Sequence, residues 1–271
     1  MGDRSSIEWT DATWNPTTGC DRVSPGCDHC YAMTLAKRLK AMNNPRYQND
    51  GRALSSGPGF ALTLHPDKLE EPRKWKTPRR VFVNSMSDLF HAAVPKSFIS
   101  SVFRTMEATP QHTYQILTKR AARMTRIVAE IQPDPLPNVW LGVSVEDQRL
   151  ADKRVPLLLE TPAAIRFLSC EPLLDKVTLG RSLDEIDWVI AGGESGPGWR
   201  PLDVAWLRSL RDECLRYGVA FFLKQLGGHP DKRGGQKALL DRRTWRQWPD
   251  STSGESDRAA FGERALRSLA G

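Results

Sequence analysis

The sequence lacks the long apolar runs and the leader pattern that direct a chain into or across a membrane. No stretch approaches the ~18 uninterrupted apolar residues of a membrane-spanning helix. The opening residues, MGDRSS, lack the basic-then-apolar order of a secretory signal. Cysteine is scarce as well, with 5 residues, an odd number. These features fit a reducing compartment better than a disulfide framework, so we expect a cytoplasmic protein with no membrane partner.

Two common sequence signatures of cofactor and metal sites are also missing. The G-x-G-x-x-G fingerprint of an open dinucleotide-binding sheet does not follow the first expected strand. Neither a second C-x-x-C nor an H-x3-5-H completes a four-ligand zinc site. Charge is not lacking, because 39 Lys and Arg against 32 Asp and Glu give a formal net charge of +7. The basic residues are widely spread, so nucleic-acid contact and an ordinary solvated basic surface both remain open.

Short apolar runs alternate along the chain with segments of helical spacing. The expected strands are residues 12–14, 60–64, 81–83, 114–117, 139–143, 165–168, 188–191 and 220–223. The expected helices lie near residues 35–42, 98–106, 124–131, 150–159 and 204–215. This alternation predicts an α/β fold with a parallel (β/α) barrel, either eight-stranded or partial, and an open doubly wound sheet is its rival.

No second domain is visible in the sequence. We expect a single barrel domain over residues 1–230 and a C-terminal extension over residues 231–271. Trp245 and Trp248 are expected to dock this extension, and the polar run from Asp250 to Asp257 is expected to be flexible.

A loop rich in glycine and proline carries Cys20, Cys27 and Cys30 in a C-x6-C-x2-C pattern. Three thiols this close in sequence cannot all pair as disulfides, so the pattern indicates metal ligation. An iron–sulfur cluster held by three thiolates would leave one iron open to an external ligand, and cysteines on a compact loop are typical of cluster binding. A zinc ion, which prefers four ligands, is the alternative.

Polar residues follow the expected strands, where a parallel barrel places its active site. The serines and Asp88 can also cap the helices that follow, and Cys170 can be a small buried hydrophobe. Lys119 stands at an expected helix start, where a cation opposes the macrodipole and a charged ligand is favoured. Glycines beside Glu194 allow close approach of a ligand to the backbone. The candidates are Ser87, Asp88, Lys119, Ser144, Cys170, Gly192, Gly193 and Glu194.

The cysteine loop resembles that of radical S-adenosylmethionine (SAM) enzymes. Residues 27–30 match the end of their C-x3-C-x-Φ-C motif with His29 at the Φ position, although six residues rather than three separate Cys20 from Cys27. Nearly the whole chain is similar to an uncharacterised phage- and prophage-associated family, itself similar to spore photoproduct lyase. The segments that carry this likeness are residues 14–16, 19–20, 26–31, 84–90, 117–120, 168–172 and 192–195.

The resemblance implies a [4Fe–4S] cluster on Cys20, Cys27 and Cys30, with SAM bound to the open iron. An external electron donor would then drive reductive cleavage of SAM, and the resulting 5'-deoxyadenosyl radical would take a hydrogen atom from the substrate. Lys119 is expected to bind the SAM carboxylate. The residues expected around the cofactor are His29, Ser87, Asp88, Ser144, Gly192, Gly193 and Glu194.

The Gly-Gly-Glu motif of the superfamily normally follows the second strand, whereas residues 192–194 follow a late one, so contact with substrate is the alternative for them. We therefore hypothesise a radical SAM enzyme, of lyase or transferase type, acting on nucleic acid or a nucleotide-derived substrate. Cys170 is the candidate hydrogen-atom donor to a substrate radical. The alternatives are a zinc-stabilised nucleic-acid-binding protein without catalysis and an iron–sulfur electron carrier or scaffold.

Overall fold

The computed structural model describes residues 5–249 and divides them into two compact units. The first unit comprises the described residues up to Gly142 together with Glu160–Ala164. The second comprises Val143–Leu159 and the described residues from Ile165 onward. Both units combine parallel strands with helices, which confirms the expected α/β class. The single barrel domain over residues 1–230 stays a prediction.

Seven strands form one sheet in the order β1-β4-β5-β6-β7-β8-β9. Pairing is parallel for β1 with β4, β4 with β5, β7 with β8, and β8 with β9. Seven strands in this order correspond to the partial form of the predicted barrel rather than the eight-stranded one. The strands are β1 (Ala12–Trp14), β4 (Arg80–Val83), β5 (Thr113–Thr118), β6 (Val139–Ser144), β7 (Ile165–Cys170), β8 (Trp188–Gly192) and β9 (Ala220–Gln225).

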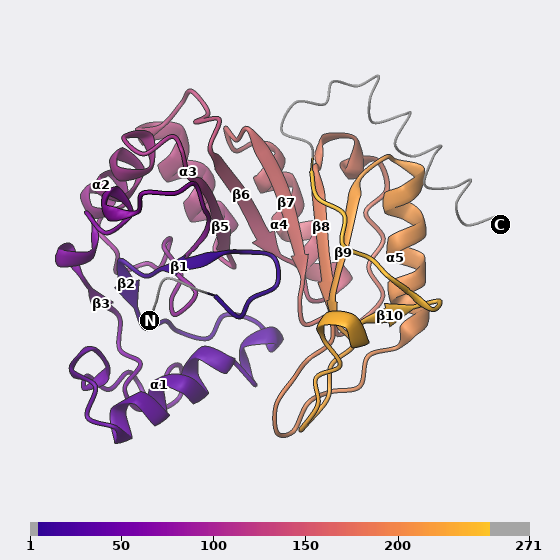
Figure 1. Ribbon diagram of the computed structural model, residues 1–271, viewed down its shortest axis with the longest axis horizontal. Coiled ribbons are helices and arrows are strands. Elements are labelled where there is room, and N and C mark those ends of the chain that lie inside the picture. The colour runs from indigo at the N-terminus through magenta and orange to yellow at the C-terminus, as the bar shows by residue number, and fades with distance from the viewer. Residues whose placement is uncertain (1–4, 250–271) are drawn as a thin grey trace. The chain divides into compact units, whose positions relative to one another are not determined.

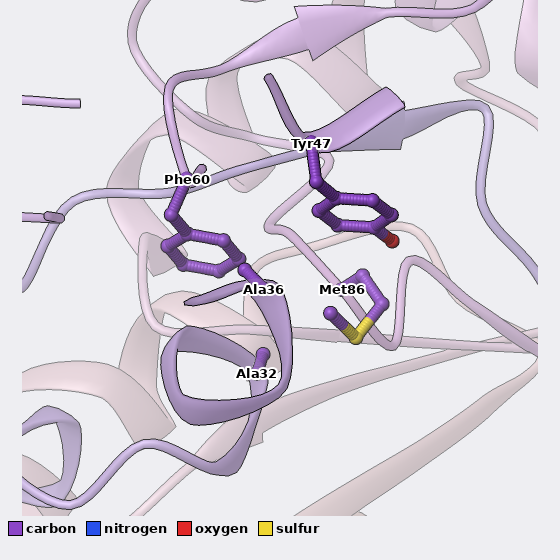
Figure 2. Close-up of a cluster of buried hydrophobic side chains, with 5 residues drawn as sticks. All are labelled: Ala32, Ala36, Tyr47, Phe60 and Met86. Atoms are coloured by element: carbon purple, nitrogen blue, oxygen red, sulfur yellow. The ribbon is translucent and has the colours of Figure 1, made fainter. Parts of the chain in front are cut away.

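The expected strand at residues 60–64 is wrong as a member of this sheet. Only β3 (Thr63–Leu64) is extended, and it pairs antiparallel with β2 (Thr17–Thr18). Phe60 instead packs in an apolar cluster with Ala36 and Tyr47 (Figure 2). Its apolar character therefore reflects contact with a helix rather than a place in the barrel.

In the described part of the chain, five α-helices occupy the segments where helical spacing predicted them. In the second unit, α5 buries Leu207, Leu210 and Leu215 and lies alongside β8 and β9 (Figure 1). Its first turn is capped by Asp203, whose carboxylate accepts a hydrogen bond from the amide of Ala205 at 2.8 Å. The helices are α1 (Tyr31–Ala41), α2 (Lys96–Glu107), α3 (Ala121–Ile131), α4 (Gln148–Leu159) and α5 (Val204–Arg216).

The remaining elements are short. They are the 3-10 helices Pro25–Cys27, Pro45–Tyr47, Pro66–Lys68, Pro72–Lys74, Gly180–Glu185 and Gly235–Lys237, and the hairpin of β10 (Leu239–Leu240) and β11 (Arg243–Thr244).

The described part of the C-terminal extension packs through its two tryptophans. Trp245 is buried, and Trp248 stacks on Trp188 of β8 with ring centroids 4.9 Å apart. The expected flexible run from Asp250 to Asp257 lies outside the described residues. Within residues 5–249, no helix has the length and apolar character needed to cross a membrane.

Candidate metal and cofactor site

Gly19 brings the cysteine loop close to the segment that precedes β3. Its φ of +86° is a left-handed conformation that glycine adopts without steric penalty. A Cβ at this position would lie 2.1 Å from the carbonyl oxygen of Ala61. The Gly19 amide donates to the carbonyl of Met86 at 2.9 Å. Cys20 is therefore placed beside the residues that follow β4, at the end of that strand.

Cys27 and Cys30 lie just before the start of α1. Cys27 ends the 3-10 helix Pro25–Cys27, and Cys30 is the N-cap residue of α1. The Thr34 amide donates to the Cys30 carbonyl at 3.2 Å, which closes the first turn of the helix. Because a helix N-terminus carries partial positive charge, this position favours a thiolate at Cys30.

An apolar cluster lies behind two of the three thiols. It comprises Ala32, Ala36, Tyr47, Phe60 and Met86 (Figure 2), and the partly buried Cys20 and Cys30 pack against it. All three loop cysteines are free thiols. The thiols therefore lie at the border of a region of low dielectric constant, where charge interactions are stronger than in water.

Burial opposes ionisation of Cys20 and Cys30 when no metal is bound. It raises the pKa of Cys20 to about 12, with a further upward contribution from Asp88 and an opposing one from Arg120. Burial also raises the pKa of Cys30, whereas hydrogen bonds from the amides of Met33 and Ala32 lower it by less. Metal binding would therefore release protons from this loop.

Arg120 joins the turn after β5 to the cysteine loop. Its Nη2 donates to the Asp21 carbonyl at 3.1 Å and lies 3.7 Å from Cys20 Sγ. Asp21 also accepts a hydrogen bond from Ser55 at 2.5 Å, and His91 Nε2 lies 2.9 Å from the other carboxylate oxygen. His91 Nδ1 accepts from the amide of Ala93, so Nε2 carries the proton donated to Asp21. These contacts fix the backbone on the C-terminal side of Cys20.

Asp88, an expected SAM contact, organises the turn between β5 and α3. One carboxylate oxygen accepts from the Thr118 hydroxyl at 2.7 Å and the Phe90 amide at 3.0 Å. The other accepts from the Lys119 amide at 3.1 Å and lies 3.8 Å from Arg120 Nε. With both oxygens engaged, the side chain has a clear structural role in the described conformation.

Ser87 and Lys119, two other expected cofactor contacts, also lie in the first unit. The Ser87 hydroxyl donates to the Thr17 carbonyl at 2.9 Å and lies 2.6 Å from the Thr17 hydroxyl, so it secures β2. Burial raises the pKa of the Cys30 thiol, and the charge of Lys119 makes a smaller contribution in the opposite direction. His29 is exposed on the loop between Cys27 and Cys30. The structure therefore brings Ser87, Asp88 and Lys119 near the cysteine loop without showing a role for them in cofactor binding.

The other expected site residues belong to the second unit. They are Ser144, Cys170, Gly192, Gly193 and Glu194. The Ser144 carbonyl accepts from Arg154 at 2.8 Å. Cys170 is fully buried, and burial raises the pKa of its thiol, as do Glu171 and Glu146.

Glu194 is held by Arg200 within its own loop. Its carboxylate accepts from the Arg200 amide and Nε, both at 2.9 Å, and from Nη2 at 2.5 Å. The neighbouring glycines allow close packing, since a Cβ at Gly193 would lie 2.4 Å from the Leu226 carbonyl oxygen. Glu194 therefore closes the loop after β8 onto itself, which the Gly-Gly-Glu pattern alone did not indicate.

A second polar group that sequence reasoning did not single out lies at the carboxyl ends of β7 and β9. Lys224 Nζ is 3.2 Å from Glu171 Oε1, and the Ser169 hydroxyl donates to Oε2 at 3.3 Å. A Cβ at Gly192 would come 2.9 Å from the same Oε1. The only signal available in the sequence was that Ser169, Glu171 and Lys224 come shortly after the expected strands at 165–168 and 220–223. The contact of Arg120 with Cys20 was not predicted either, because in the sequence Arg120 stood out only as a polar residue shortly after an expected strand.

Within residues 5–249, no group of three or more His, Cys, Asp or Glu side chains is arranged to hold a metal ion in the described conformation. The thiols of Cys20 and Cys30 each interact electrostatically with that of Cys27, so the three belong to one local group.

Comparison with known proteins gives one family and one solved structure. None of the curated proteins matches the sequence. The chain is similar to a solved structure of a cysteine-to-serine mutant of spore photoproduct lyase, with 12% identity and a TM-score of 0.46. That match covers 90% of this chain and 65% of the other, so this chain spans about two thirds of its length. A family model described as "Protein of unknown function (DUF5131)" matches residues 4–249, and the chain therefore belongs to the DUF5131 family.

Proposed function

We propose that this protein is a radical SAM enzyme that binds a [4Fe–4S] cluster through Cys20, Cys27 and Cys30. The observation that carries the proposal is a single loop that presents three free cysteines beside an apolar cluster, with an arginine at one of them. When bound, the cluster and SAM would supply an electron-driven cleavage of SAM that yields a 5'-deoxyadenosyl radical. The association of this family with phages and prophages stays a prediction.

The donor set fits such a cluster. Thiolate sulfur is the ligand type on which iron–sulfur clusters are built, and three thiolates leave one iron for an external ligand. The N-terminus of α1 at Cys30 and the guanidinium of Arg120 at Cys20 both provide positive charge where thiolate charge would develop. The partly buried setting of Cys20 and Cys30 would limit access of water.

The protein's own residues would hold and shield the cofactors rather than perform the chemistry. Lys119 is the proposed partner of the SAM carboxylate, because it directly follows β5 and its charge opposes the rise in the pKa of Cys30 that burial causes. Five further residues are proposed to contact the cofactor, namely His29, Ser144, Gly192, Gly193 and Glu194. Cys170 is proposed to donate a hydrogen atom to a substrate radical. For Ser87 and Asp88 the hydrogen bonds favour an indirect role, in which they hold the turns around the loop.

Anaerobic reconstitution with iron and sulfide tests the proposal. We expect about four iron atoms per chain, a visible absorption band, and 5'-deoxyadenosine when SAM and dithionite are added. The Cys20→Ala, Cys27→Ala and Cys30→Ala variants should each lose all three signals. The matched control is Cys214→Ala, because Cys214 is a buried free cysteine in the second unit.

Metal analysis of freshly purified protein separates the zinc alternative. One zinc ion per chain, with no iron uptake and no SAM cleavage, would contradict the proposal and favour a zinc-stabilised binding protein. Iron and sulfide uptake without any cleavage of SAM would favour an electron carrier. The proposed substrate is nucleic acid or a nucleotide derivative, which the net charge of +7 supports.

A further inference from the structure

We propose that Arg120 is a positioning residue for the Cys20 thiolate and that its guanidinium raises the midpoint potential of the cluster bound there. This inference rests on the proposed function, because it concerns the same three-cysteine loop.

The geometry links Arg120 to the sulfur and to the backbone that carries it. Nη2 lies 3.7 Å from Cys20 Sγ and donates to the Asp21 carbonyl at 3.1 Å. The sequence separation is 100 residues, so this contact exists only because the loop after β1 and the turn after β5 meet in the first unit. One guanidinium nitrogen therefore contacts both a cluster ligand and the residue next to it.

The position of Arg120 is set from several sides. Its amide donates to the Thr118 hydroxyl at 2.9 Å, and its Nε lies 3.8 Å from the Asp88 carboxylate, which is itself held by Thr118 and the Lys119 amide. The side chain is only 15% exposed, and its buried Nε has no hydrogen-bond partner. Packing thus directs the guanidinium towards Cys20 although one of its own donors stays unused.

The local cost of this placement supports a functional interpretation. Arg120 is the N-cap residue of α3, where the helix macrodipole disfavours a cation. No acidic residue lies in the first turn of that helix to offset it. The Asp88 carboxylate, 3.8 Å from Arg120 Nε, offsets part of this charge, and a negatively charged cluster at the cysteine loop would offset more of it.

The expected effect on a bound cluster follows from its charge. Reduction adds one electron, so the reduced cluster is more negative by one unit and is stabilised by a nearby cation and by an N–H donor to sulfur. Arg stays protonated at all working pH values. Removing the guanidinium should therefore make the cluster harder to reduce and lower its midpoint potential.

Three variants test this on reconstituted protein by a redox titration followed by electron paramagnetic resonance. Arg120→Met should lower the equilibrium constant for one-electron reduction at least tenfold, which is ~59 mV for a one-electron couple. Arg120→Lys should give a smaller decrease, because it keeps the charge but loses the planar fork. Arg126→Met is the matched control, since it removes an exposed arginine of the same helix and should leave the potential unchanged.

The outcomes separate this inference from the proposed function. A full cluster in Arg120→Met with the wild-type potential overturns the role of Arg120 and leaves the enzyme proposal intact. Wild-type protein that takes up no cluster overturns both. If Arg120→Met is less thermally stable than the wild type or binds less iron, the midpoint potential of Arg120→Lys is used instead. An unchanged midpoint potential in Arg120→Lys then overturns the inference. An equal shift in Arg126→Met would overturn it too, because the effect would then be one of net charge.

Discussion

Two buried histidines in the first unit are kept neutral by their surroundings. His112 is fully buried between the edges of Trp75 and Tyr114, with Nε2 3.2 Å from the Pro72 carbonyl. His65 lies 2.9 Å from the Thr18 hydroxyl, beside β2. Burial lowers the pKa of both rings below the ordinary value of 6.5. Both are therefore expected to couple the stability of the protein to pH.

These two residues should make the protein less stable in acid. Below pH 6.5 the unfolded chain binds protons at these histidines that the folded chain does not, so their contribution is present above pH 6.5 and is lost as the pH falls. We expect the urea midpoint to decrease between pH 7.5 and pH 5.5. His65→Gln should flatten this decrease, because it removes one of the two buried rings. A midpoint independent of pH in the wild type would contradict the prediction.

At the scale of elements, the junction between β2 and the cysteine loop depends on close approach as well as on backbone conformation. Gly19 and Gly57 both have positive φ, +86° and +99°. A Cβ at Gly19 would meet the Ala61 carbonyl oxygen at 2.1 Å, whereas one at Gly57 would meet nothing within 4 Å. Alanine substitutions at these two glycines therefore distinguish the effect of steric exclusion, present only at Gly19, from that of backbone strain, present at both.

We expect Gly57→Ala to lower the free energy of unfolding by about 1–2 kcal/mol, the cost of a left-handed backbone for a residue with a Cβ. Gly19→Ala should lower it by clearly more and should also reduce iron uptake, because either the loop or residues 61–62 must move. Urea denaturation and iron analysis of the two variants measure this difference. Equal losses in both would show that φ alone limits the position.

A buried ion pair joins α4 to the end of β6 in the second unit. Arg154 Nη1 lies 2.7 Å from Glu146 Oε2, and their side chains are 5% and 0% exposed. The same nitrogen donates to the Ser144 carbonyl. In the first unit, Lys96 and Glu130 form a pair of the same length, 2.7 Å, with both side chains largely exposed.

Removal of one partner should therefore have different effects at the two pairs. Arg154→Met should lower the free energy of unfolding by about 3–5 kcal/mol, because Glu146 would remain buried without its cation. Lys96→Met should have a much smaller effect, since water replaces an exposed partner. The double variant Glu146→Leu with Arg154→Leu should recover much of the loss. Urea denaturation at neutral pH checks all three, and equal effects of the two single variants would contradict the expectation.

At the scale of the whole molecule, the net charge of +7 bears on the proposed substrate class. If about four phosphates are neutralised on a single strand, the logarithm of the affinity should fall with the logarithm of salt concentration with a slope of about −3. That slope corresponds to a loss of roughly 50-fold between 50 and 200 mM salt. Fluorescence anisotropy with a labelled single-stranded RNA measures it.

A polyglutamate chain provides the control for this binding experiment, because it carries negative charge without bases or phosphates. We expect RNA to bind more tightly than polyglutamate at equal charge. Equal binding would indicate an ordinary basic surface, and no binding of RNA at 50 mM salt would contradict the proposed substrate class.

Much of the local structure could be predicted from the sequence. The helix from Val204 to Arg216 was expected from apolar residues at helical spacing, and its C-terminal limit lies within one residue of the expectation. The strand at 188–191 was recognisable as a short apolar run, and β8 extends it by one residue. In contrast, residues 60–64 carry the same apolar signal, yet Phe60 packs on α1 and only two residues pair as a strand.

The sequence by itself determined the helices, most strands and the loop that carries Cys20, Cys27 and Cys30, because periodicity and spacing act over a few neighbouring residues. Only the tertiary structure decided which polar side chains support that loop. The contact of Arg120 with Cys20 spans 100 residues, and that of Ser87 with Thr17 spans 70. Such contacts depend on how β1, β4 and β5 pair within the first unit, and a parallel pairing leaves no local signal in the chain.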